Sequence, residues 1–335
     1  MTRCFFIWTL IVFAFLTPSL CAEERPRERR ERFFGMLDIN GDGTLTLDEI
    51  TRHSTGPDLI IGAKGNSLQL TLNTLYHVSR PVENLPYSFY KDFINYRDET
   101  GEKVSGKYAS TVRVAIPYCL GDSYRNFRVV GTTGDLFEKV PYGRQNDGTP
   151  QNYTFAQGKN FREDDFFGAV IGSVAAKQAG LKIGDRFPLT HGIVPDGHVH
   201  DEDAFHVTGI LNPTGRLNDR AVFVNMEGFY LLESHAKPVP TDADKKESKS
   251  LPEAQREVTA ILLFLKNPIH AMVIQQKVRE GNIAQAVFPV REIHRVFSDR
   301  DDLSLFHELS AAIRASGGKV SQNHFSNQTE KNERR

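Results

Sequence analysis

The chain has 335 residues, of which 39% are hydrophobic and 25% are charged, and its formal net charge is −1. This near-neutral balance gives no electrostatic reason to expect binding to nucleic acid or attraction to an anionic membrane. Cys4 and Cys21 lie near the N-terminus, so Cys119 has no partner for an internal disulfide in the rest of the chain. Cys119 lies in an apolar stretch, and we expect it to be a buried small hydrophobe.

The N-terminal segment has the pattern of a secretory signal peptide. Arg3 precedes an apolar run over residues 5–20, and Cys21-Ala22 then precedes a charged stretch. We expect cleavage after Ala22, so that residues 1–22 form the leader. The run is short for a bilayer span, which needs about 20 apolar residues. The sequence therefore predicts a periplasmic or secreted protein, and an uncleaved membrane anchor is the alternative.

Residues 38–49 match the calcium loop of an EF-hand, whose ligands are oxygens at fixed positions. The expected ligands at loop positions 1, 3, 5, 7 and 12 are Asp38, Asn40, Asp42, the backbone carbonyl of Thr44 and the bidentate carboxylate of Glu49. Gly43 occupies position 6, where the chain turns sharply and a Cβ would be costly. The spacing specifies ligands and turn together, and it predicts a Ca²⁺ site. A solvated acidic turn without metal is the alternative.

The flanking segments complete a helix-loop-helix unit over residues 24–54. The first helix is rich in Arg and Glu and then becomes apolar, which suits a helix with one buried face. Its apolar residues are Phe33, Phe34, Met36 and Leu37. The second helix begins at Leu47 and stops before Gly56-Pro57. One loop is present, so the hand is either unpaired or packed on the main domain, and we expect a weak Kd of about 10⁻⁴ to 10⁻³ M.

From Asp58 onward the sequence alternates between strand-like and helix-like segments, which is typical of an α+β domain. Strands are expected at residues 59–62, 111–119, 127–131, 168–171, 205–211, 221–225, 258–265 and 286–290. Helices are expected at residues 86–96, 173–179, 268–279 and 303–315. Gly121-Asp122 is expected to form the turn after the second strand, and Gly180 and Gly281 are expected to end their helices.

Two segments contain stretches that are too polar to be expected in a folded core. Residues 237–256 are rich in Lys, Asp, Ser and Pro and are expected to form a mobile loop. Residues 301–335 are expected to contain one amphipathic helix followed by a disordered polar tail.

Six blocks resemble, in order, the MacB-like periplasmic core domain of FtsX-type ABC transporter permeases. Residues 126–137, which include Val129-Val130-Gly131-Thr132-Thr133, resemble that family's VVGTTPDFF signature. The other blocks are residues 156–161, 169–175, 180–185, 205–211 and 219–224. The resemblance implies an α+β extracytoplasmic domain over residues 58–300, with a second subdomain inserted into the first and no catalytic residues.

This chain departs from the family pattern in two ways. The permeases carry membrane-spanning helices around this domain, and we find no such segment here after the leader. The EF-hand lies where the permease would emerge from its first span. We therefore do not expect transport by this chain alone, and the resemblance implies at most a partnership with a membrane permease and an ATPase.

A histidine-rich segment is a second candidate metal site. His191, His198, His200 and His206 fall within sixteen residues, among several carboxylates. A His-x-His pair on an extended segment places both rings on one face, where they can bind zinc or copper. His198 and His200 are the expected core ligands, and an ordinary exposed loop is the alternative.

The sequence gives little support to an enzyme. It lacks a nucleophile elbow, a phosphate loop and a His-Glu-x-x-His motif. The adjacent pairs Asp164-Asp165 and Asp301-Asp302 are interpreted as turn and cap residues. We therefore expect an exported, non-catalytic calcium-binding protein that acts as a binding or assembly component. A soluble subunit of a split ABC-transporter permease is the alternative, and an uncharacterised hydrolase ranks last.

Overall fold

The computed structural model describes residues 56–77, 83–145, 148–191, 203–232 and 250–298. The predicted leader, the EF-hand unit and the helix and tail at residues 301–335 lie outside these ranges. Within these ranges, no helix combines the length and the apolar character needed to cross a membrane.

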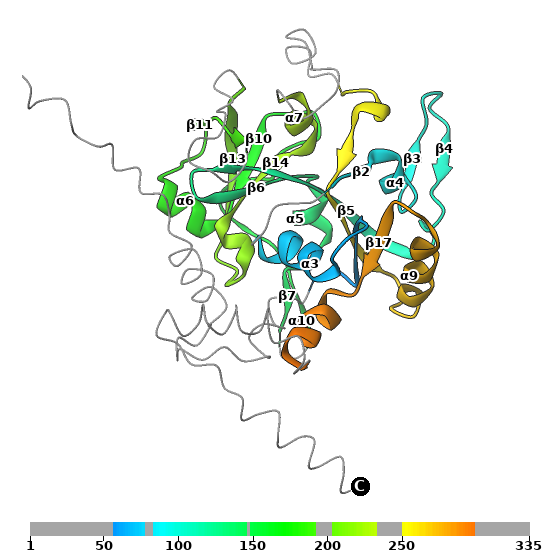
Figure 1. Ribbon diagram of the computed structural model, residues 1–335. Helices are drawn as coiled ribbons and strands as arrows, with labels where there is room; N and C mark the ends of the chain where they lie inside the picture. Colours follow the sequence, from blue (N-terminus) through cyan, green and yellow to red (C-terminus); the bar gives the residue numbers. More distant parts are fainter. Residues whose placement is uncertain (1–55, 78–82, 146–147, 192–202, 233–249, 299–335) are drawn as a thin grey trace, which may run out of the picture.

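The fold is α+β, with helices packed on a mixed sheet of 11 strands (Figure 1). In chain order these strands are β1 (Leu59–Ala63), β5 (Val112–Tyr124), β6 (Phe127–Thr132), β9 (Phe155–Gly158), β10 (Gly168–Ile171), β11 (Arg186–Phe187), β12 (Thr190–His191), β13 (Phe205–Leu211), β14 (Ala221–Asn225), β16 (Ala260–Leu265) and β17 (Ala284–Val287). The main path through the sheet is β11-β13-β10-β14-β6-β5-β16-β1-β17. The pairs β10–β13 and β14–β6 are parallel, and the other pairs are antiparallel.

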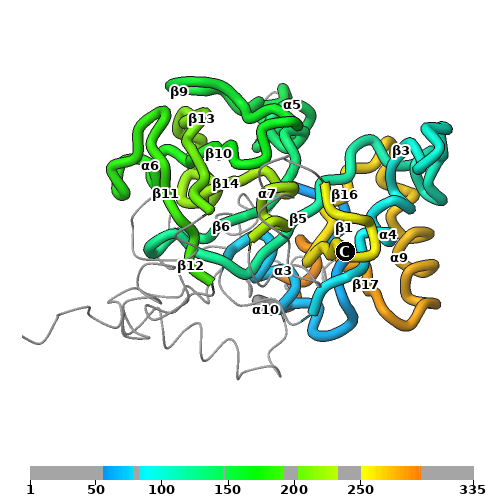
Figure 2. The backbone as a smooth tube through the Cα atoms, turned by 90° about the horizontal axis from the view of Figure 1, so that it is seen from above, coloured from blue at the N-terminus to red at the C-terminus, as the bar shows by residue number. Residues whose placement is uncertain are grey.

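The long strand β5 joins two halves of this sheet (Figure 2). Its first part, up to Tyr118, pairs with β16, and its second part, from Cys119, pairs with β6. The half that contains β16, β1 and β17 is built from both ends of the described chain. The other half is built from the middle of the chain.

Three helices cover the first half, and two of them lie on opposite faces of β1. They are α3 (Ser67–Tyr76), α9 (His270–Glu280) and α10 (Pro289–Ser298). Leu59 and Ile61 share one hydrophobic cluster with Ile274 of α9, whereas Ile60 packs with Leu70 of α3. Alternate residues of a strand point to opposite faces, so this alternation places α9 and α3 on the two sides of the sheet.

The second half encloses a cluster of aromatic rings. Its helices are α5 (Asp135–Lys139), α6 (Ser173–Ala179) and α7 (Met226–Leu231). Phe137 of α5 lies at the centre of the cluster and is 5% exposed. Its ring makes edge contacts with Tyr153 at 5.3 Å, with Phe223 at 5.2 Å and with Phe155 and Phe161. Such edge-to-face pairs add to the energy of burial alone.

Shorter elements surround the sheet. They are β2 (Leu85–Pro86), α4 (Tyr87–Lys91), β3 (Asn95–Arg97), β4 (Lys103–Ser105), β7 (Gly143–Arg144), β8 (Pro150–Gln151), the 3₁₀ turns η1 (Leu217–Arg220) and η2 (Glu253–Gln255), and β15 (Glu257–Val258). Arg256 donates to Glu227 at 3.1 Å and to the carbonyl of Leu251. Residues 250–256 are thus attached to α7, and the rest of the expected mobile loop, residues 237–249, lies outside the described residues.

Several predicted elements are confirmed. The strands at residues 59–62, 168–171, 205–211 and 221–225 match β1, β10, β13 and β14. Helix α6 ends at Gly180, which adopts the left-handed conformation at φ 72°. Helix α9 ends at Gly281, as expected.

Other predictions are wrong. Gly121-Asp122 is not the turn after β5, because the strand continues through it with a register shift between Leu120 and Ser123, and the chain turns at Arg125. The helix expected at residues 86–96 covers Tyr87–Lys91, after which Asn95–Arg97 forms a strand. The last strand ends at Val287 rather than residue 290, because Pro289 begins α10. Helix α3 was not predicted.

Candidate functional site

The predicted calcium ligands lie outside the described residues, so the structure places none of them. These ligands are Asp38, Asn40, Asp42, Thr44 and Glu49. His198 and His200 also lie outside. Within the described ranges, no group of three or more His, Cys, Asp or Glu side chains is arranged to hold a metal ion.

The two described histidines of the histidine-rich segment bind separate carboxylates. His191 is on β12, and its Nδ1 lies 3.3 Å from Oδ1 of the buried Asp122 on β5. His206 is on β13, and its Nε2 lies 3.0 Å from Oδ2 of Asp165. Each ring therefore has a different carboxylate partner, and the structure does not bring the two rings together at one site.

The carboxylate pair Asp164-Asp165 is divided between two partners. Asp164 binds Arg162 through two contacts of 2.8 and 2.6 Å, and Asp165 binds His206. The side-chain amide of Asn225 donates to the carbonyls of residues 162, 163 and 165 and so holds this turn. These contacts agree with the interpretation of the pair as turn residues.

Cys119 is confirmed as a buried small hydrophobe at the middle of β5. Burial raises the pKa of its thiol to about 12. The Sγ–H donates to Tyr230, whose hydroxyl in turn donates to the carbonyl of Glu257 at 2.7 Å. A thiol with so high a pKa holds its proton at neutral pH, so it is unsuited to act as a nucleophile.

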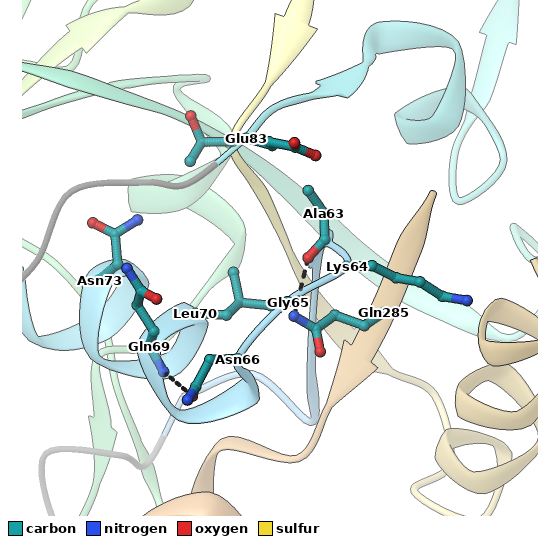
Figure 3. Close-up of a pocket in the computed structure, with 10 residues that line it drawn as sticks. Ala63, Lys64, Gly65, Asn66, Gln69, Leu70, Asn73, Glu83 and Gln285 are labelled. Carbon is teal, nitrogen blue, oxygen red and sulfur yellow. Dashed lines mark hydrogen bonds between the residues drawn. The ribbon is translucent and has the colours of Figure 1, made fainter. Parts of the chain in front are cut away.

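A shallow polar pocket opens between the first turns of α3 and the sheet (Figure 3). Its volume is about 330 Å³ including the open mouth. The polar residues that line it include Asn66, Gln69, Asn73, Glu83, Thr259 and Gln285. Asn66 accepts from the backbone N–H of Gln69, and Gln285 donates to the carbonyl of Ala63. Neutral amides, the hydroxyl of Thr259, the exposed carboxylate of Glu83 and the exposed amine of Lys64 offer hydrogen bonds to a ligand. Among the described lining residues, no hydrogen bond joins a nucleophile to a base.

Buried polar side chains continue from this pocket into the sheet. Asn73 of α3 is 2% exposed, and its Oδ1 accepts from Nη2 of Arg128 at 3.4 Å. Arg128 is 6% exposed and belongs to β6, a strand that is otherwise apolar apart from Thr132. An arginine near the start of a buried, mostly apolar strand is the sequence signal that could have revealed this group.

His77 ends α3 beside this arginine. It adopts the left-handed conformation at φ 57°, which closes the helix, and its N–H donates to the carbonyl of Leu72. The residue as a whole keeps some surface in solvent, but both ring nitrogens are buried and have no hydrogen-bond partner among the described residues. Burial, and secondly the charge of Arg128, lower the pKa of His77 to about 3. The imidazole is therefore neutral at physiological pH.

Comparison with solved structures finds a structural likeness, whereas comparison with family models and curated proteins finds no match. The extracellular domain of the noncanonic ABC-type transporter YknZ from Gram-positive bacteria is similar over 68% of this chain and 98% of its own length, at 8% identity and a TM-score of 0.36. A likeness at this level supports no functional argument.

Proposed function

We propose that this chain is an exported, non-catalytic calcium-binding protein whose single EF-hand loop, residues 38–49, holds the ion. The observation that carries the proposal is the complete ligand pattern of the loop, with three oxygen side chains, a turn glycine and a bidentate glutamate at their required spacing. Calcium is a hard cation that is bound by such oxygen sets. The leader pattern at residues 1–22 would deliver the loop to a compartment with abundant calcium, where weak affinity suffices.

The core domain, residues 58–300, is proposed to be MacB-like and to act as a binding or assembly element. The six ordered sequence blocks support this assignment, and a mixed α+β sheet is compatible with it. The alternative is a soluble subunit of a split ABC-transporter permease, periplasmic or anchored by an uncleaved leader. Co-purification with a membrane permease and an ATPase would favour that alternative.

Isothermal titration should detect one calcium site with a Kd of about 10⁻⁴ to 10⁻³ M. Glu49→Gln removes the bidentate carboxylate and should abolish the heat of binding. Glu102→Gln, at an exposed carboxylate in the turn between β3 and β4, is the matched control and should leave the titration unchanged. Equal heats in wild type and Glu49→Gln would remove the calcium proposal.

Zinc or copper binding at the histidine-rich segment is a second, separate proposal. The outer histidines, His191 and His206, already have carboxylate partners, so they are not part of the proposed site. It rests on His198 and His200, a His-x-His pair. Zinc titration should give heat that disappears in the His198→Ala/His200→Ala variant. The absence of heat in wild type, or the same heat in the variant, would refute it.

A further inference from the structure

The first two turns of α9 expose three apolar side chains. Ile269 is 72% exposed, Met272 is 66% exposed and Val273 is 58% exposed. They are spaced at i, i+3 and i+4 and therefore form one continuous surface, which we call the α9 patch. The opposite side of the same helix is buried against the sheet through Ala271, Ile274 and Val278. Clustered exposed apolar residues of this kind mark an interaction surface.

The α9 patch lies at the end of the sheet where the described chain begins. The N–H of Asp58 donates to the carbonyl of Leu263, and the carboxylate of Asp58 accepts from the N–H of Leu265 at 2.7 Å. Ile269 follows Leu265 by four residues. Figures 1 and 2 show α9 on the outer side of the sheet, with the side away from β17 uncovered by any other described element.

The length of the connection limits where the predicted EF-hand can sit. Its predicted second helix starts at Leu47 and is expected to reach Arg52, which leaves five residues before Asp58. The six Cα–Cα steps from Arg52 to Asp58 span at most about 22 Å in an extended chain. The end of the hand is therefore confined to the neighbourhood of Asp58, which is also the neighbourhood of the α9 patch.

A single hand also needs a partner for its own apolar face. The predicted first helix carries Phe33, Phe34, Met36 and Leu37, and the sequence contains no second EF-hand loop motif whose helices could cover them. Calcium opens the helix pair of sensor-type EF-hands and exposes an apolar groove. Burying that groove against an apolar surface within reach removes both apolar surfaces from water.

We propose that the calcium-loaded EF-hand docks the apolar face of its first helix onto the α9 patch. This inference rests on the proposed calcium binding and adds the surface that receives the loaded hand. Because docking is available to the calcium-bound form, it raises calcium affinity, and calcium in turn strengthens docking by the same factor. The core domain is thereby stabilised by an ion held outside it.

Photocrosslinking in the full chain tests the contact. With the photocrosslinker benzoyl-phenylalanine in place of Met272, calcium should increase crosslinks to peptides from residues 24–54. The matched control carries the same group in place of Ile183, which is 42% exposed and lies in the loop between α6 and β11, beside the other half of the sheet. It should give no such crosslink.

Calcium affinity supplies a second measurement. Met272→Ser/Val273→Ser should weaken calcium binding about fivefold or more, since couplings of this kind typically span 5–150-fold. Ile183→Ser should leave the affinity unchanged.

The outcomes of the two experiments separate docking from calcium binding. If wild type binds calcium but neither the crosslinks nor the calcium affinity depends on the α9 patch, docking is refuted and calcium binding stands. If wild type binds no calcium, both proposals fall. Crosslinks between two copies, or patch-dependent flotation with anionic phosphatidylglycerol vesicles without an effect on calcium affinity, would also overturn docking.

Discussion

Phe137→Ala is expected to lower the free energy of unfolding by about 3–5 kcal/mol, the usual cost of removing a buried aromatic ring. Phe137 is 5% exposed, and its ring contacts four other aromatic rings, three from residues 153–161 and one from β14. The deletion loses the transfer energy of the ring and leaves a cavity among side chains that cannot all move inward.

Urea denaturation of the two proteins measures this difference. Phe137→Leu is the graded control and should cost less, because it keeps much of the apolar volume. A loss below about 1 kcal/mol for Phe137→Ala would contradict the packing described for this cluster.

Lowering the pH should destabilise the wild-type chain through His77. The pKa of His77 is about 3 in the folded chain, against an ordinary value of about 6.5 for a histidine in water. Between these values the unfolded chain binds a proton that the folded chain does not. The free energy of unfolding that depends on the neutral imidazole of His77 is therefore fully present above pH 6.5, and it is lost progressively as the pH falls toward 3. Each pH unit within this window costs up to about 1.4 kcal/mol, so about 2–3 kcal/mol is lost by pH 4.5.

The comparison with His77→Asn isolates this effect from other titrating groups. Asparagine tolerates the left-handed conformation of residue 77 and has no titration in this range. The difference in unfolding free energy between wild type and His77→Asn should change with pH in the stated direction. Parallel pH profiles for the two proteins would mean that the imidazole is not shielded from water.

Continuous apolar runs allowed the buried strands to be predicted from sequence. Residues 168–171 are bounded by a glycine and lack polar side chains, and they form β10 as expected. The turn after β5 was misplaced because glycine and aspartate suit a bulge as well as a turn. There β5 continues through Gly121-Asp122, and Arg125 provides the positive φ of 52°.

Helix α3 was missed because its leucines partly alternate, which hides the helical period. Its N-terminal signal was present in Asn66, whose side chain accepts from the N–H of Gln69. At the other end of the domain, Pro289 suits the first position of α10, which ends the preceding strand earlier than its apolar residues suggest.

The calcium ligands could be proposed from sequence alone because they lie within twelve consecutive residues. The buried group of Asn73, His77 and Arg128 could not, because Asn73 and Arg128 are 55 positions apart and meet only when α3 packs beside β6. Likewise, the separate carboxylate partners of His191 and His206 depend on strand pairing that no local pattern specifies.

Equilibrium dialysis measures directly whether the loop at residues 38–49 binds calcium. At several millimolar calcium, the wild-type chain should retain close to one calcium ion, and Glu49→Gln should retain none above the buffer level. Equal retention by the two proteins, or no retention by wild type, would mean that Glu49 and its loop hold no calcium.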